Sequence, residues 1–107
     1  MQLITAIIQP FMVERLTRLL RKLEVTGYTV SQVSGSGRFL RDTPEYTQNR
    51  IKVEIAVNDD QLDEICDLIC STVSTHQDGD GIILVTPLTR VINLQTGAMG
   101  PKVLRPD

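Results

Sequence analysis

Two periodicities of apolar and polar positions take turns along the chain and predict strands and helices in alternation. Residues 51–57 alternate strictly between apolar and polar side chains, which is typical of a half-buried strand. Residues 2–8 are largely apolar and end before Pro10, which cannot donate to a strand ladder. The expected strands cover residues 2–8, 28–33, 51–57 and 82–85, the last one interrupted at Pro87 and resuming at residues 91–94.

Two further segments have the spacing of amphipathic helices. The apolar positions of the first are Met12, Leu16, Leu19, Leu20 and Leu23, and those of the second are Leu62, Ile65, Cys66, Ile69 and Val73. Asn58 is a good N-cap for the second helix, and Gln61 can close a capping box with it. The resulting order of elements is β-α-β-β-α-β.

This order predicts an α+β, ferredoxin-like fold, with an antiparallel sheet and both helices on one of its faces. Residues 82–85 are apolar at successive positions, so the last strand has apolar side chains on both faces. The face without helices therefore needs a cover. Further copies of the same sheet are the simplest one, and this favours a closed homo-oligomer.

Length and charge limit the possible classes of protein. The chain has 107 residues, which predicts a single domain over residues 1–107 with an irregular tail at about 97–107. Its net charge of −2 and isoelectric point near 5.3 provide no basic field for nucleic acid. The short apolar start lacks the features of a secretion signal, so we expect a cytoplasmic protein without membrane insertion.

The metal-ligating side chains are few. Cys66 and Cys70 lie one helical turn apart, and His76 is the single histidine. A zinc site needs three or four ligands, so we expect the cysteines to be a buried structural pair and the protein to hold no metal.

Two glycine-rich turns are candidates for an anion-binding site. Gly35-Ser36-Gly37-Arg38 follows the second strand, and Gly79-Asp80-Gly81 precedes the last. Glycines let backbone N–H groups approach an anion, and Arg38 would complete a phosphate cradle, although each turn could equally be an ordinary one. A Walker lysine is absent, and no catalytic triad can be assembled, so we expect no enzyme activity.

Taken in order, six motifs resemble the PII signal-transduction proteins over about residues 3–97. They are Ala6-Ile7-Ile8-Gln9-Pro10-Phe11, Val25-Thr26-Gly27-Tyr28-Thr29-Val30, Gly35-Ser36-Gly37-Arg38, Lys52-Val53-Glu54-Ile55, Gly79-Asp80-Gly81 and Arg90-Val91-Ile92 with Thr96-Gly97. The resemblance implies a homotrimer that binds an adenine nucleotide in clefts between subunits. It also implies a regulated protein target, contacted by a T-loop at about residues 38–50.

The resemblance assigns nucleotide-binding residues one by one. Ile7, Thr29, Glu54 and Ala56 match positions around the adenine; Gly35, Ser36, Gly37 and Arg38 match the start of the T-loop beside the phosphates; Gly79, Asp80 and Gly81 match the B-loop over the phosphates; and Arg90 matches an arginine near the same cleft.

The chain departs from this family at cationic positions. Members that bind ATP firmly have a lysine and two arginines where Ile82, Asn93 and Gln95 stand. Each lost charge-assisted contact costs about 1.5–3 kcal/mol, so we expect ADP or AMP to bind better than ATP, with cyclic AMP a further candidate.

Phe39 replaces the glutamine that the family uses for Mg²⁺ and 2-oxoglutarate, and the T-loop is short. Both departures resemble divergent PII-like proteins of inorganic-carbon handling, such as the carboxysome-associated type and the regulator of a bicarbonate transporter. Bicarbonate would then find its anchor among Arg38, Arg41 and Arg50, because a planar guanidinium matches a planar oxyanion.

Other functions share this fold and stay open at this point. One is a nitrogen-regulatory PII protein. Another is a trimeric metal-binding protein of the divalent-cation tolerance type, which would use His76, Asp78, Asp80 and a cysteine. A dimeric amino-acid-binding module of the ACT type and an acylphosphatase-like enzyme are the remaining alternatives.

Overall fold

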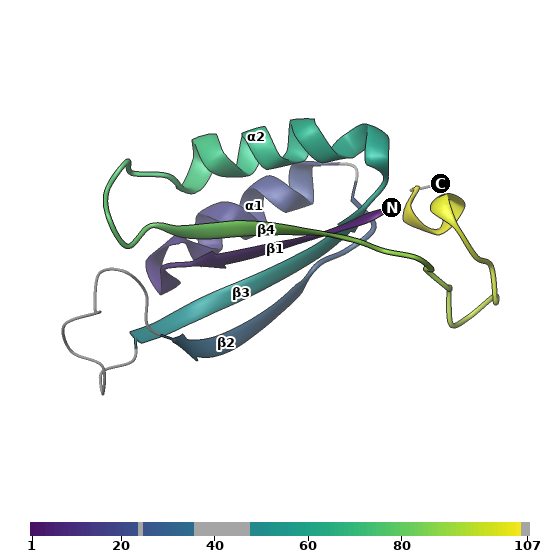
Figure 1. Ribbon diagram of the computed structural model, residues 1–107, viewed down its shortest axis with the longest axis horizontal. Helices are drawn as coiled ribbons and strands as arrows, with labels where there is room; N and C mark the ends of the chain where they lie inside the picture. The colour runs from purple at the N-terminus through teal and green to yellow at the C-terminus, as the bar shows by residue number, and fades with distance from the viewer. Residues whose placement is uncertain (24, 36–47, 106–107) are drawn as a thin grey trace.

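The structure is a computed structural model that describes residues 1–23, 25–35 and 48–105. Four antiparallel strands form one sheet in the order β2-β3-β1-β4, with α1 and α2 together on one face (Figure 1). The strands are β1 (Gln2–Ile8), β2 (Thr29–Gly35), β3 (Gln48–Val57) and β4 (Gly81–Pro87), and the helices are α1 (Val13–Lys22) and α2 (Leu62–Val73). The predicted ferredoxin-like fold is confirmed.

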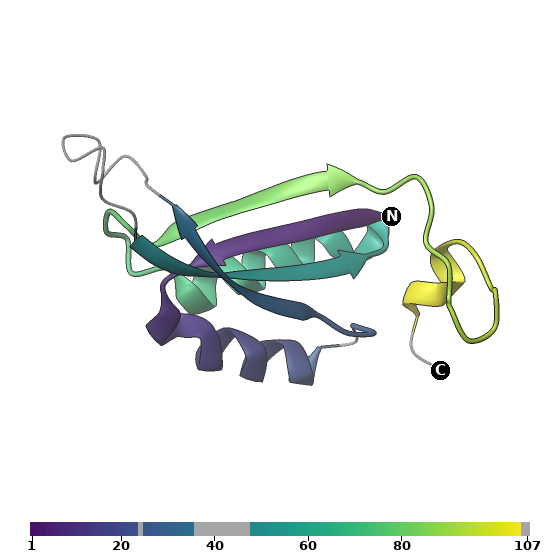
Figure 2. The same cartoon turned by 90° about the horizontal axis from the view of Figure 1, so that it is seen from below.

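Strand alternation puts the core between the sheet and the helices. β1 and β3 are the central strands, and their register pairs Ile4 with Ile55 and Ala6 with Val53, all of them fully buried. Leu16 and Leu20 of α1 and Ile69 of α2 close this core from the helical side. Figure 2 looks onto the opposite face of the sheet, with α2 behind the strands.

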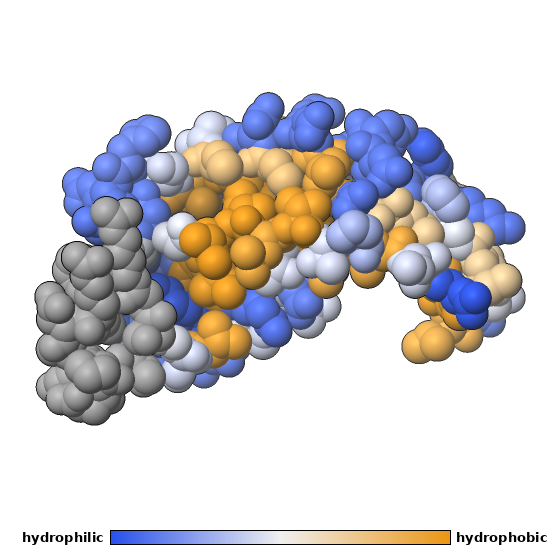
Figure 3. All heavy atoms as spheres, in the orientation of Figure 1, coloured by the Kyte–Doolittle hydropathy of each residue, from blue (hydrophilic) through white to orange (hydrophobic). Residues whose placement is uncertain are grey.

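That opposite face, called here the open face, carries the alternate side chains. In β4, Ile82 and Leu84 point away from the helices and are 56% and 48% exposed, whereas Ile83 packs against the core. Apolar side chains gather into one area where β4 runs (Figure 3). The expected two-sided apolar strand is present, and within the described residues its outer side chains are uncovered.

Helix α2 begins as the sequence predicts. The capping box of Asn58 and Gln61 is present, and it leads through the 3-10 turn η3 (Asp59–Gln61) into the helix. The backbone N–H of Asn58 donates to the Gln61 side chain at 3.1 Å. Of the two cysteines, Cys66 is half-buried against the core, and burial is the main cause that raises the pKa of its thiol.

Two expectations about local structure need correction. Cys70 is exposed rather than buried, because it lies 100° around the helix from the core residue Ile69. The last strand ends at Pro87, opposite Gln2, and after one more backbone hydrogen bond, from the Leu88 N–H to the Met1 carbonyl at 3.0 Å, it does not resume at residues 91–94. Ile92 therefore makes only an isolated bridge with Met99.

The tail is partly ordered rather than irregular. A 3-10 turn, η4 (Pro101–Leu104), lies against the start of α2, where Leu104 is buried and Asn58 Nδ2 donates to the Pro101 carbonyl at 3.1 Å.

Near the other end of the chain, the 3-10 turn η1 (Pro10–Met12) leads into α1. No helix in the described part of the chain is long and apolar enough to cross a bilayer.

Candidate functional site

The loop at residues 74–81, between α2 and β4, depends on glycine at two positions. Gly79 and Gly81 have φ angles of 90° and 125°, which side chains disfavour. A Cβ on Gly81 would lie 1.9 Å from the Ile7 carbonyl oxygen, so β4 starts against β1 at a distance only glycine allows. The sequence motif Gly79-Asp80-Gly81 thus marks a tight approach of the backbone.

Asp80 organises this loop from within. Its carboxylate accepts hydrogen bonds from the Thr75 N–H at 2.7 Å and the Thr75 hydroxyl at 2.5 Å, with longer ones from Gln77 N–H and the Ser74 hydroxyl at 3.4 Å. The hydrogen bonds from Thr75 are the main reason why the pKa of Asp80 lies below its ordinary value. Both oxygens of the carboxylate therefore serve the loop.

A residue outside the candidate set anchors the same loop to the sheet. Gln9, directly after β1, donates from Nε2 to the carbonyl oxygen of Gly79 at 2.7 Å. Gln9 belongs to the first of the six motifs, but that motif assigns it no role, and the contact with Gly79 is 70 positions away along the chain.

The first cleft, of about 590 Å³, opens between this loop and the ends of β2 and β3. Six of the residues expected at a ligand site line it: Ile7, Gly35, Arg50, Gly79, Asp80 and Gly81. Gly35 lies in the extended backbone of β2, without the positive φ that a glycine turn would need. Ile82 also lines the cleft, at the position where the resemblance places a lysine.

Two cations line the first cleft among the described residues. Arg50 Nη1 donates to the Asn49 carbonyl at 2.9 Å, and its other guanidinium nitrogen bonds the Gln48 side chain. Lys52, to which the sequence motifs assign no role, lies 3.8 Å from the Glu54 carboxylate, and both side chains are about one-third exposed. An anion in this cleft would meet Arg50 and Lys52 first.

A second cleft, of about 460 Å³, is lined by the other residues that the family resemblance places around the adenine. Thr29, Glu54 and Ala56 contribute to it, together with Leu3 and Tyr28. Thr29 pairs with Glu54 across β2 and β3, which puts both side chains on the open face. The Lys52–Glu54 ion pair links the two clefts, since Lys52 lines the first and Glu54 the second.

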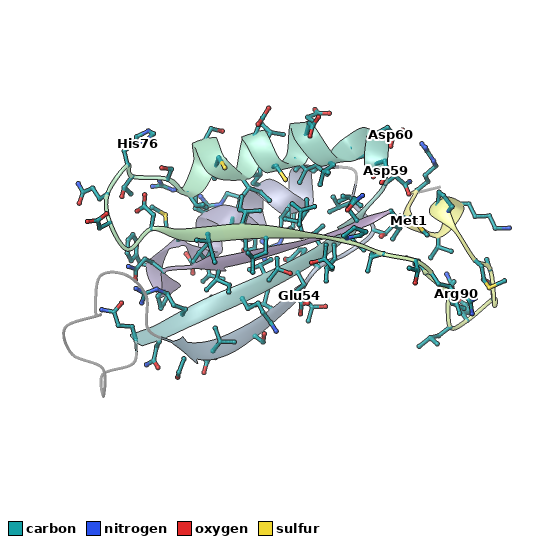
Figure 4. The ribbon with its side chains drawn as sticks, viewed as in Figure 1. Met1, Glu54, Asp59, Asp60, His76 and Arg90 are labelled. Carbon is teal, nitrogen blue, oxygen red and sulfur yellow. The ribbon has the colours of Figure 1, made fainter. Side chains whose placement is uncertain are left out.

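Arg90 lies in neither cleft. It follows the end of β4 and is exposed, far from the loop that carries His76 (Figure 4). Asn93, which stands where the resemblance places an arginine, holds its own turn: its Oδ1 accepts from Gln95 N–H at 2.8 Å and Thr96 N–H at 3.2 Å. Within one chain, the structure therefore divides the candidate residues between two clefts and an outlying arginine.

Several candidate residues fall where the structure gives no description. Ser36, Gly37, Arg38, Phe39 and Arg41 lie outside the described residues. The described ranges contain no group of three or more His, Cys, Asp or Glu side chains placed to hold a metal ion. His76 and Asp78 of the metal alternative are exposed on the loop.

Comparison with known proteins identifies the family. The family model for nitrogen regulatory protein P-II matches residues 1–98. The chain is 39% identical to nitrogen regulatory protein GlnK of Escherichia coli (strain K12) over 105 residues, which cover 91% of this chain and 94% of that protein. Nitrogen regulatory protein P-II of Nostoc punctiforme is 35% identical and that of Klebsiella oxytoca 38%, both with the same coverage. The chain therefore belongs to the PII family of nitrogen regulatory proteins, which are non-catalytic signal transducers.

Proposed function

We propose that this protein is a nitrogen-regulatory signalling protein that binds an adenine nucleotide between the copies of a homotrimer. The observation that carries the proposal is the division of the candidate residues. Gly79 and Gly81 line the first cleft, while Thr29 and Glu54 line the second, on the same open face of the sheet. A site made from the first cleft of one copy and the second cleft of its neighbour would unite them.

The uncovered apolar surface supports the association of copies. Ile82 and Leu84 expose apolar side chains on the open face, and Leu94 is 100% exposed beyond the end of β4. A small monomeric domain gains stability by covering such a surface. Arg90 follows the same strand end, so a neighbouring copy could bring it to the cleft that its own chain leaves without it.

We favour ADP or AMP over ATP as the ligand, and cyclic AMP is a further candidate. Ile82 lines the first cleft without a charge, and Asn93 is engaged in its own turn. Arg50 and Lys52 remain as described cations, enough for a short phosphate chain and fewer than a triphosphate requires. The missing cations weaken the binding of the outermost phosphate most.

Nitrogen regulation is the better-supported pathway. The curated relatives reported above are all named nitrogen regulatory proteins, and their names give no support to carboxysome or bicarbonate handling. The proposed mechanism is that of a single cytoplasmic domain whose bound nucleotide sets the shape of the T-loop and thereby its contact with a protein target. Of the three arginines considered for bicarbonate, Arg50 is the one described, and it lines the first cleft.

Titration calorimetry with AMP, ADP, ATP and cyclic AMP tests the proposal, combined with sedimentation to measure the mass. The expected result is a trimer that binds ADP or AMP at micromolar concentrations. Thr29→Tyr should fill the second cleft and abolish binding, whereas Gln32→Tyr, on the other face of the same strand, should not. Absence of binding tighter than millimolar for all four nucleotides would refute it.

A further inference from the structure

The two helices display opposite charges side by side on the outer surface of the molecule. α1 exposes Arg15, Arg18, Arg21 and Lys22, with Glu14 as its one exposed carboxylate. α2 exposes Asp63, Glu64 and Asp67 and contains no cationic residue. These sets are called here the basic stripe and the acidic stripe. The two helices lie on the face of the sheet opposite the open face (Figure 1), and no residue of either stripe lines either cleft.

Within the part of the chain that the structure describes, the members of both stripes have no partners. None of their members forms an ion pair or a side-chain hydrogen bond with another described residue, although α1 and α2 pack against each other. Elsewhere in the molecule exposed charges do pair, as Arg105 does with Asp60 at 3.1 Å. The charges on the helical layer are thus free to meet a partner.

Helix dipoles explain part of this distribution and not all of it. Arg21 and Lys22 lie in the last turn of α1, where cations interact favourably with the helix dipole. Arg18 is the sixth of the ten residues of α1, and Asp67 is the sixth of the twelve residues of α2, so both lie near the middle of their helices, where this effect has faded. The helix dipole therefore does not explain why the charges of one sign continue through the middle of each helix.

The pairing of signs restricts the partner. A membrane or nucleic acid attracted by the basic stripe would be repelled by the carboxylates of α2, within a Debye length of about 10 Å at 0.1 M salt. A uniformly cationic partner would be repelled by α1 in the same way. The surface fits a partner that carries an acidic stripe opposite α1 and a basic stripe opposite α2, with the same spacing between them.

From this complementarity we infer that the helical layer is a docking surface for the helical layer of a second copy of this chain. The two helices run antiparallel (Figures 1 and 2). A two-fold axis parallel to them puts α1 of each copy over α2 of the other, which brings Arg18 toward Asp67 and Lys22 toward Glu64 in both halves of the contact. An axis perpendicular to the helices would set α1 against α1 and is excluded by repulsion.

The size of the surface predicts a weak contact. Helices of 10 and 12 residues are about 15 and 18 Å long, and packed helices lie about 8–10 Å apart, so each copy offers roughly 350 Å². Standard interfaces use about 800 Å² per partner. Because exposed ion pairs are screened, the association should appear at low salt and high protein concentration. It links assemblies through the face that the proposed trimer does not use.

Sedimentation of the full chain at about 0.02 M and about 0.5 M salt tests the inference. At low salt we expect a mass above that of the assembly present at high salt. The association constant should be at least about tenfold greater at low salt than at high salt. R18E/K22E leaves the helical layer acidic on both helices, and E64K/D67K leaves it basic on both. Each pair of substitutions should abolish the low-salt association.

One further variant and one mixture make the result specific. The chain with all four substitutions should associate again, and an equimolar mixture of the two reversed variants should associate although neither does alone. K102E, on η4 and outside both stripes, is the control and should behave as wild type. A mass that is unchanged between the two salt concentrations, or a reversal that has no more effect than K102E, would overturn the inference.

Discussion

The carbonyl oxygen of Ile7 stands 1.9 Å from the position that a Cβ on residue 81 would occupy. Gly81 also has a φ of 125°, so any side chain there meets both a clash and an unfavourable backbone angle. The end of the loop at residues 74–81 and the first residue of β4 can therefore lie against β1 only because residue 81 has no side chain.

Gly81→Ala should consequently destabilise the protein by more than about 1–2 kcal/mol, because relief of the clash requires β4 to move away from β1. Urea unfolding followed by circular dichroism measures this change. Gly27→Ala is the matched control, since a Cβ there would have nothing within 4 Å. Equal stability of the Gly81 and Gly27 variants would contradict the structure.

The hydrogen bond from Gln9 to the Gly79 carbonyl supplies a second prediction. Gln9→Leu removes the donor while the side chain keeps a similar size, and the loss of one such bond costs about 0.5–1.5 kcal/mol. The loss should be local, so amide exchange should become faster at residues 74–81 and stay unchanged in the central strands. Gln32→Leu, an exposed position on β2, should leave the loop as it is, and slower or unchanged exchange after Gln9→Leu would refute the anchor.

Asp80 makes the stability of the loop depend on pH. Its pKa is lowered in the folded protein, chiefly by the hydrogen bonds from Thr75, so its contribution is fully present above the unfolded pKa of about 3.9. The contribution is lost as the pH falls through the folded value. Asp80→Asn should therefore be less stable than wild type at neutral pH, and the difference should shrink below about pH 4.

Unfolding at a series of pH values, together with carboxylate titration by NMR, measures this dependence. Asp78→Asn is the control in the same loop, because Asp78 is exposed and makes no hydrogen bond among the described residues. If Asp80→Asn and wild type differ equally at pH 7 and pH 3, the hydrogen bonds of Asp80 do not set the stability of the loop.

The elements that could be predicted from the sequence are those whose own side chains define them. The alternation from Ile51 to Val57 specifies β3 and its buried face, and Asn58 with Gln61 specifies the start of the next helix. The end of β4 could not be predicted in this way. It depends on where β1 begins, because Pro87 pairs with Gln2, the first residue of that strand.

The candidate site was predictable in part for a similar reason. The glycines of the loop could be recognised in the sequence as a Gly-Asp-Gly motif. The structure explains the motif, since the φ angles of both glycines and the close approach of Gly81 to Ile7 disfavour side chains. Gln9 and Lys52 stand within two of the motifs, but the motifs assign them no role, because their roles arise from contacts with residues distant in the sequence or on the neighbouring cleft. Arg90 lines neither cleft of its own chain, so only the family resemblance, and no contact in the structure, connects it with the site.

The uncharged side chain of Ile82 leads to the last prediction, which depends on the proposed function. Ile82 lines the first cleft and is largely exposed, so a lysine can replace it without disturbing the core. A lysine stands at this position in relatives that bind ATP firmly, as the family resemblance implies. Ile82→Lys should add one charge-assisted contact, worth about 1.5–3 kcal/mol, and raise the affinity for ATP roughly 10- to 100-fold.

Calorimetry with ATP and AMP separates a specific contact from a general change in charge. Val85→Lys adds the same charge to the same strand on its other face, so it should alter the affinity for ATP little. The gain from Ile82→Lys should be larger for ATP than for AMP, because the new ammonium group reaches the outer phosphates. An equal gain in both variants would show that overall charge, and not the position beside Gly81, controls the choice of nucleotide.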